Sequence, residues 1–181
     1  NELWAVANAT PTLDTSKSPT LGNLNSYATV TPPTNGSTTG AVRVSALIDS
    51  GGTLANFTDA DSTDLPGMAI TGVKSDASLY YSTDAGAHWN PVGAVSSLSA
   101  RVLHADANTW VYYAPAAETP SGNVAEAITF KAWDQSGGYS NGEAYVNTVG
   151  GYKSLSAGSY DTLGKGNDVV VSGQYAYLAD E

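Results

Sequence analysis

Short apolar runs alternate with turn-forming residues along most of this chain. From residue 41 onward the runs are rich in β-branched and aromatic residues, and Gly, Pro, Asn, Asp or Ser separate them. Regular alternation of short strands and turns is typical of an antiparallel β-sandwich. We therefore predict an all-β fold whose main strands are 41–48, 67–74, 78–83, 88–92, 100–104, 110–114 and 127–134.

Alternation within single segments supports this fold class. In the segment 127–134, the apolar and small residues at 128, 130 and 132 share one face of a strand. Thr129, Lys131 and Trp133 share the other face, which we expect to be the wetter one. Helical patterns are confined to 95–106, where at most one short helical turn is expected.

Composition shifts along the chain suggest its organisation. Residues 8–40, which make up most of the first 40 residues, are rich in Thr, Pro, Asn, Ser and Gly. Because prolines remove backbone donors and favour turns, we predict an irregular lead-in that packs on the domain and contains one strand at 27–31. Residues 41–181 would form the β-sandwich. After Asp134 the sequence is rich in Gly, Tyr, Ser and Asn, which predicts long loops, and strands at 168–171 and 174–178 follow across a tight turn.

The composition also narrows the function classes. The 181 residues include 7 basic and 17 acidic side chains, for a net charge of −10, and no Cys. Scattered Lys and Arg leave no basic surface for phosphates, so nucleic acid is not an expected partner. No apolar run approaches the roughly 20 residues of a membrane span, so membrane insertion is not expected. The chain begins without Met or an apolar leader, and we expect a monomeric module of a longer chain.

Three segments are rich in oxygen donors. Their candidate metal ligands are, in chain order, Asp59, Asp61, Asp64, Asp134, Asn141, Glu143, Asp161 and Asp168. Hard Ca²⁺ prefers about six to eight oxygen ligands, and turns can bend several carboxylates around it. Bound Ca²⁺ would offset the self-repulsion of an acidic chain and would stabilise a fold that has no disulfides. We therefore predict Ca²⁺ as the cofactor, and ordinary solvated acidic turns remain the alternative.

Catalytic motifs are weak in this sequence. No Gly-x-Ser-x-Gly turn opens a helix, and the lack of strand–helix alternation excludes an α/β-hydrolase. A glycosidase needs two carboxylates that face each other across a cleft, and 17 acidic residues leave that reading open. We expect that the protein is not an enzyme.

Several motifs stand together between residues 41 and 147. They are Leu65-Pro66-Gly67 after the acidic turn, Leu79-Tyr80-Tyr81-Ser82, His88-Trp89, Arg101-Val102-Leu103-His104 and, most specific, Ala132-Trp133-Asp134-Gln135 at the end of a strand. With these motifs the chain resembles a domain of very large repetitive bacterial surface adhesins. The Gly/Tyr/Asn-rich segment that follows Gln135 most resembles the peptide-binding domains near the C-terminal ends of RTX adhesins of Gram-negative bacteria.

This resemblance implies a Ca²⁺-stabilised β-sandwich that is exported by type I secretion and lies at the bacterial cell surface, where it serves adhesion and biofilm formation. It would bind the free C-terminus of a peptide or protein on a host or neighbouring cell, and the ligand carboxylate would complete the Ca²⁺ coordination. Asp59, Asp61 and Asp64 would form a structural Ca²⁺ site. The implied ligand-binding residues are Asp134, Gln135, Tyr139, Ser140, Asn141, Glu143 and Tyr160.

Two other functions fit the same residues. A Ca²⁺-dependent carbohydrate-binding module would combine the cation with Tyr and Trp platforms for a glycan, and a passive extender domain would use Ca²⁺ only for rigidity. The tail 159–181 also resembles the opening of a propeller repeat, because Val-Ser-Gly-x-Tyr-Ala-Tyr occurs at 171–177. One such unit cannot close a propeller. The tail therefore either pairs with the sandwich or begins a next domain.

Overall fold

The computed structural model describes residues 8–21, 31–115, 126–149, 166–172 and 175–180. These residues form an all-β fold with a single 3-10 turn, η1 (Val44–Ala46). The strands are β1 (Thr12–Leu13), β2 (Val42–Arg43), β3 (Phe57–Thr58), β4 (Gly67–Val73), β5 (Ser78–Ser82), β6 (Asn90–Pro91), β7 (Arg101–His104), β8 (Trp110–Ala114), β9 (Ile128–Trp133), β10 (Gly166–Ser172) and β11 (Tyr175–Asp180).

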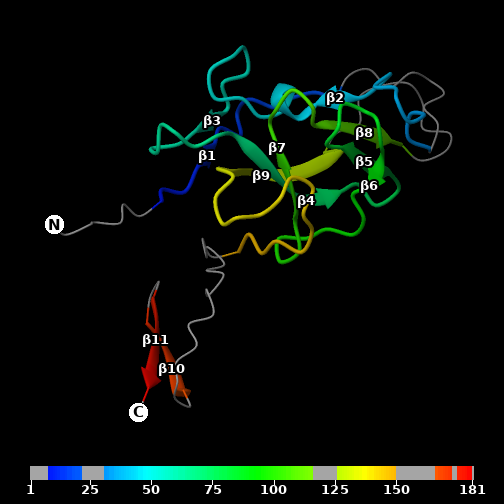
Figure 1. The fold of residues 1–181 in the computed structure, drawn as a ribbon. Helices are drawn as coiled ribbons and strands as arrows, with labels where there is room; N and C mark the ends of the chain where they lie inside the picture. Colours follow the sequence, from blue (N-terminus) through cyan, green and yellow to red (C-terminus); the bar gives the residue numbers. More distant parts are fainter. Residues whose placement is uncertain (1–7, 22–30, 116–125, 150–165, 173–174, 181) are drawn as a thin grey trace.

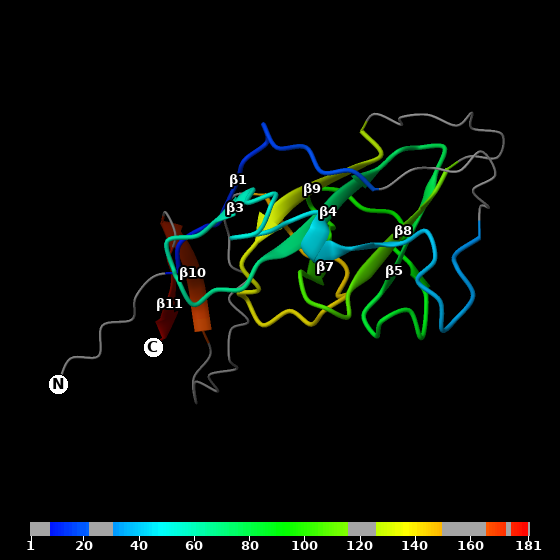
Figure 2. The same ribbon diagram turned by 90° about the horizontal axis from the view of Figure 1, so that it is seen from above.

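Two antiparallel sheets make up the sandwich (Figures 1 and 2). One sheet has the strand order β2-β8-β5-β6, and the other has the order β7-β4-β9. The strands β1 and β3 form a small separate pair beside them. The strands β10 and β11 pair only with each other, as a hairpin that joins neither sheet of the sandwich. The predicted sandwich fold class is thus confirmed.

The main core lies between the two sheets. Leu79 and Tyr113 are cross-strand partners on the inner face of the four-stranded sheet, and Met68 and Leu103 are partners on the inner face of the other. All four side chains are buried. Each buried aliphatic or aromatic side chain of this kind stabilises a fold by about 1.5–3 kcal/mol. In β8, the buried Val111 and Tyr113 alternate with the half-buried Trp110 and Tyr112, which is the period of two that a strand requires.

A second, smaller cluster covers the outer face of the three-stranded sheet. It contains Trp133 with Ala69, Ala100, Val102 and Val146, and Tyr139 packs against it. Trp133 is only 8% exposed, so the prediction that it lies on the wetter face is wrong. The outer face is buried here because the segment that follows β9 folds back over the sheet. Val146 of this segment forms an isolated β-bridge with Ala100. Both faces of the β7-β4-β9 sheet are therefore covered near Trp133.

The expected strands between 67 and 134 are confirmed within a few residues, but two other expectations differ from the structure. The segment 41–48 is a two-residue strand followed by η1, because Val44, Leu47 and Ile48 are all buried at a helical spacing. No helical turn forms at 95–106, where β7 and a bridge between Ser96 and Ser99 lie instead. The pairing of β1 with β3 was not predicted.

The predicted strand at 27–31 lies outside the described residues except for Thr31, which is not in a strand. The expected strands 168–171 and 174–178 correspond to β10 and β11, and the turn between them is outside the described residues. No helix within the described part of the chain has the length and hydrophobicity that a membrane span needs.

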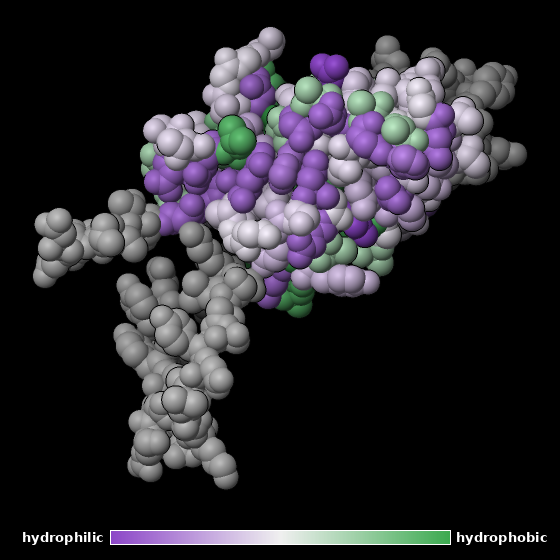
Figure 3. Space-filling model, viewed as in Figure 1, coloured by the Kyte–Doolittle hydropathy of each residue, from purple (hydrophilic) through white to green (hydrophobic). Residues whose placement is uncertain are grey.

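The face shown in Figure 3 is largely hydrophilic, and its hydrophobic residues occur in small, scattered groups. The large hydrophobic residues that are exposed among the described ones are Leu65, Leu98, Tyr145 and Val149. Some exposed apolar residues are normal on the surface of a folded protein. The apolar content of the sequence is thus placed mainly in the two clusters.

Candidate metal centre

The acidic turn is held in shape by its own backbone and side chains. It begins directly after β3, where the β1-β3 pair fixes the direction of the chain. Asp59 Oδ1 accepts a hydrogen bond from the Asp61 N–H at 2.9 Å, and the Asp64 N–H donates to Asp61 O at 3.0 Å. An Asp that accepts from the N–H two residues later forms an Asx turn. This turn leads through Pro66 into β4, which starts at Gly67.

The end of β9 lies beside the start of β4. Gly67 is the register partner of Trp133, so Asp134 follows β9 at the point where the acidic turn enters β4. Gln135 has a positive φ of 60°, and its Nε2 donates to Pro66 O at 2.7 Å. Antiparallel pairing therefore brings Asp134 next to Asp64, although 70 positions separate them in the sequence.

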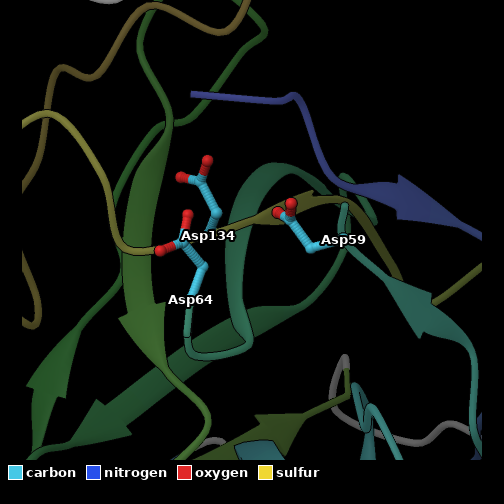
Figure 4. Close-up of side chains that lie close together, drawn as sticks. All are labelled: Asp59, Asp64 and Asp134. Atoms are coloured by element: carbon cyan, nitrogen blue, oxygen red, sulfur yellow. The ribbon is translucent and has the colours of Figure 1, made fainter. Parts of the chain in front are cut away.

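Three carboxyl groups from these two segments converge. Asp59, Asp64 and Asp134 each offer an oxygen, and these oxygens all lie within 4.8 Å of one another. Figure 4 shows the three side chains gathered around a common space, with Asp59 and Asp64 on the loop before β4 and Asp134 after β9. Such a group could hold a metal ion.

The burial of the group favours a cation. Asp134 is only 5% exposed. Asp59 Oδ2 is buried and makes no hydrogen bond to any described residue. A buried carboxylate oxygen without a partner costs free energy unless a proton, a water molecule or a cation satisfies it. The orphaned oxygen, together with two further carboxylates close by, thus fits a hard cation.

Asp134 is held in its ionised form. Burial raises the pKa of its carboxyl group, but hydrogen bonds from Ser136 and Asn8 outweigh burial, and the pKa is lowered. The Ser136 N–H donates to Asp134 Oδ1 at 2.9 Å, and Asn8 Nδ2 donates to Asp134 Oδ2 at 2.5 Å. Asp134 therefore presents a negative charge at neutral pH, as a metal ligand must.

The remaining member of the acidic turn has another partner. Asp61 is not in the converging group, and its Oδ2 accepts the Ala9 N–H at 2.6 Å. The sequence pattern predicts no role for residues 8 and 9 in the site and places them in the irregular lead-in. Their contacts arise because β1 pairs with β3 across more than 40 positions, a pairing for which two-residue strands give no sequence signal.

Asn141 and Glu143 use their side chains elsewhere. Asn141 Oδ1 accepts the His104 N–H at 3.0 Å, and its Nδ2 donates to Thr109 Oγ1 at 2.7 Å. Glu143 is exposed, and its Oε2 accepts the Ser140 N–H at 2.7 Å. The Val102 N–H donates to Glu143 O at 3.0 Å. In the structure these residues fasten the loop after β9 to the edge of β7, and Glu143 is not in the acidic group.

The remaining residues that were predicted to bind a metal or a ligand lie outside the group of three carboxylates. Tyr139 packs against Trp133 with ring centroids 6.5 Å apart, and Gln135 fixes the entry of β4 as described. Tyr160 and Asp161 lie outside the described residues. The backbone of Asp168 lies in β10, where it pairs with Ala179 of the separate hairpin.

In comparisons with protein-family models, with curated proteins and with solved structures, no match to the chain was found. The functional conclusions therefore rest on the residues and on their geometry.

Proposed function

We propose that this chain is a calcium-binding adhesion module of a bacterial cell surface, and that its cation site binds the free C-terminal carboxylate of a peptide or protein. The observation that carries the proposal is the convergence of Asp59, Asp64 and Asp134. All the donors are carboxylate oxygens, which suit hard cations and not the softer metals that prefer thiolate or imidazole.

Calcium is favoured over magnesium by the source of the ligands. Two of the three carboxylates come from the turn before β4 and the third comes from the end of β9, so no single regular element imposes one coordination geometry on them. Ca²⁺ tolerates irregular geometry with more oxygens, whereas Mg²⁺ demands near-ideal octahedral geometry and keeps several waters. Three carboxylates leave coordination positions that water or a ligand carboxylate can fill.

Peptide binding is tested with a library of peptides that have free C-termini and with the same peptides as C-terminal amides. Calorimetry in millimolar calcium is expected to detect binding of some free acids, with loss of that binding for the matched amides and in excess EGTA. Binding that persists in EGTA, or that is equal for acids and amides, would refute the proposed recognition of a carboxylate by the cation.

One observation favours a second function, a structural extender domain. Asp134 is only 5% exposed, and its carboxylate accepts a hydrogen bond from the side chain of Asn8. A closed site of this kind would rigidify the module without offering the cation to a ligand. Calcium-dependent thermal stabilisation without any ligand in the peptide library, or in a glycan array, would support the extender function over peptide recognition.

A further inference from the structure

The first described residues of the chain cross the metal centre as a strap, here defined as residues 8–14. At one end, Asn8 donates to Asp134 and the Ala9 N–H donates to Asp61. At the other end, β1 pairs with β3, and the Asp14 N–H donates to Asn56 O at 2.8 Å. In Figure 4 this segment, drawn in blue, passes beside the three carboxylates.

We propose that Asn8 is a further ligand of the cation and that cation binding and docking of the strap are coupled. This inference rests on the proposed calcium site. In the structure the amide nitrogen of Asn8 faces Asp134 Oδ2. An Asn side chain carries a donor and an acceptor on the same planar group. Turning the amide over would place Oδ1 where the donor now lies, at the cost of the hydrogen bond that Nδ2 donates to Ala9 O at 2.8 Å.

The charges at the site determine which orientation is favoured. Without a cation, an N–H donor stabilises the ionised Asp134, which is what the observed bond does. With a cation among the three carboxylates, the positive end of the amide would point toward a positive charge, so the inverted amide is favoured. An amide oxygen is an ordinary Ca²⁺ ligand and adds a donor without adding negative charge.

The coupling must act in both directions. If Asn8 strengthens cation binding, the cation stabilises the docked strap by the same factor, because linkage between two equilibria is reciprocal. The Ala9 and Asp14 amides are the natural reporters, since both donate hydrogen bonds that exist only while the strap is docked. Calcium is therefore expected to slow hydrogen exchange at these amides more than at Ala41, whose N–H bonds to Thr38 O in a distant turn.

Calcium titration of the 181-residue chain by calorimetry tests the assignment. Asn8→Ala is expected to lower calcium affinity at least about tenfold, whereas Asn8→Asp, which keeps an oxygen, is expected to retain it. Asn108→Ala is the matched control, because Asn108 is exposed and its side chain makes no hydrogen bond to another described residue. Unchanged calcium affinity is expected for this control.

The outcomes separate the two proposals. If Asn8 is only a donor to Asp134, it competes with the cation, and Asn8→Ala would keep or raise calcium affinity. That result, or calcium-independent exchange at Ala9 and Asp14, overturns the Asn8 assignment and leaves the calcium site intact. A wild-type chain that binds no calcium overturns the calcium site, and the Asn8 assignment falls with it.

Discussion

Trp133 is expected to support both the fold and the metal centre, because it is the residue before Asp134. It is 8% exposed, its ring lies 5.5 Å from His104 and 6.5 Å from Tyr139 between centroids, and its Nε1 donates to Ser136 O at 3.1 Å. Ser136 in turn donates to Asp134 Oδ1. Trp133 therefore holds the turn that fixes the Asp134 carboxylate.

Two substitutions separate packing from hydrogen bonding. Trp133→Ala removes the largest side chain of the second cluster, and a buried aromatic-to-Ala change costs about 3–5 kcal/mol. Trp133→Phe keeps much of the packing but loses the bond to Ser136, which contributes about 1 kcal/mol net. We expect both variants to lower the free energy of unfolding in that order, and to weaken the stabilisation that calcium gives.

Urea denaturation in EGTA and in calcium measures these changes. Trp89→Ala is the matched control. Like Trp133, Trp89 is mostly buried and its Nε1 donates a hydrogen bond to a backbone oxygen, Ser37 O. Its ring packs beside Tyr112, away from the candidate metal centre. Its calcium response is expected to equal that of the wild type. A loss of less than about 1 kcal/mol in Trp133→Ala would refute the second cluster as a part of the core.

Three further predictions concern the metal site, a surface turn and a close contact. Calcium at about 100 times its Kd is expected to raise the free energy of unfolding by about 2.7 kcal/mol and the melting temperature by about 5–10 °C. The substitution Asp134→Asn is expected to abolish both increases. Hydrogen bonds from His88 and Ser82 lower the pKa of Asp84 to about 2, which NMR titration of its carboxyl carbon would measure. Gly67→Ala is expected to lower stability by about 1–3 kcal/mol in denaturation, since its Cβ would lie 2.8 Å from the Trp133 ring.

Each of these predictions has a contrary result. An equal calcium shift in Asp134→Asn would place the cation elsewhere. For Asp84, the lowered pKa means that its contribution to stability is present above the ordinary value of 3.8 and is lost as the pH falls toward about 2. A titration midpoint near 3.8 would contradict the bonded turn. Unchanged stability in Gly67→Ala would contradict the contact with Trp133, because the Leu103 carbonyl oxygen, 3.0 Å from the same Cβ, limits any movement.

The strands that the sequence predicted well are those in which packing follows a local alternation. In β8, Val111 and Tyr113 are buried and Tyr112 is not, so the period of two is visible in the residues themselves. Trp133 was misplaced because its face is covered by a distant loop, and no local pattern reports such a cover. The segment after β2 carried a helical spacing at Val44, Leu47 and Ile48 that could have predicted η1.

The residue types of the candidate metal centre were predictable, but which of these residues come together was not. Oxygen-rich turns around Asp59 and Asp134 indicated hard-cation sites, yet as two separate sites. They form one group because Gly67 pairs with Trp133, a register that the sequence does not encode locally. Asn141 has the right chemistry for a ligand, but its amide is used to bind His104 and Thr109.

The most direct test of the proposed calcium site is a crystal structure of the chain grown in calcium chloride, with anomalous differences measured to identify the ion. The predicted result is a calcium peak that is coordinated by oxygens of Asp59, Asp64 and Asp134. Ordered electron density for these three carboxylates with no ion among them would contradict the account.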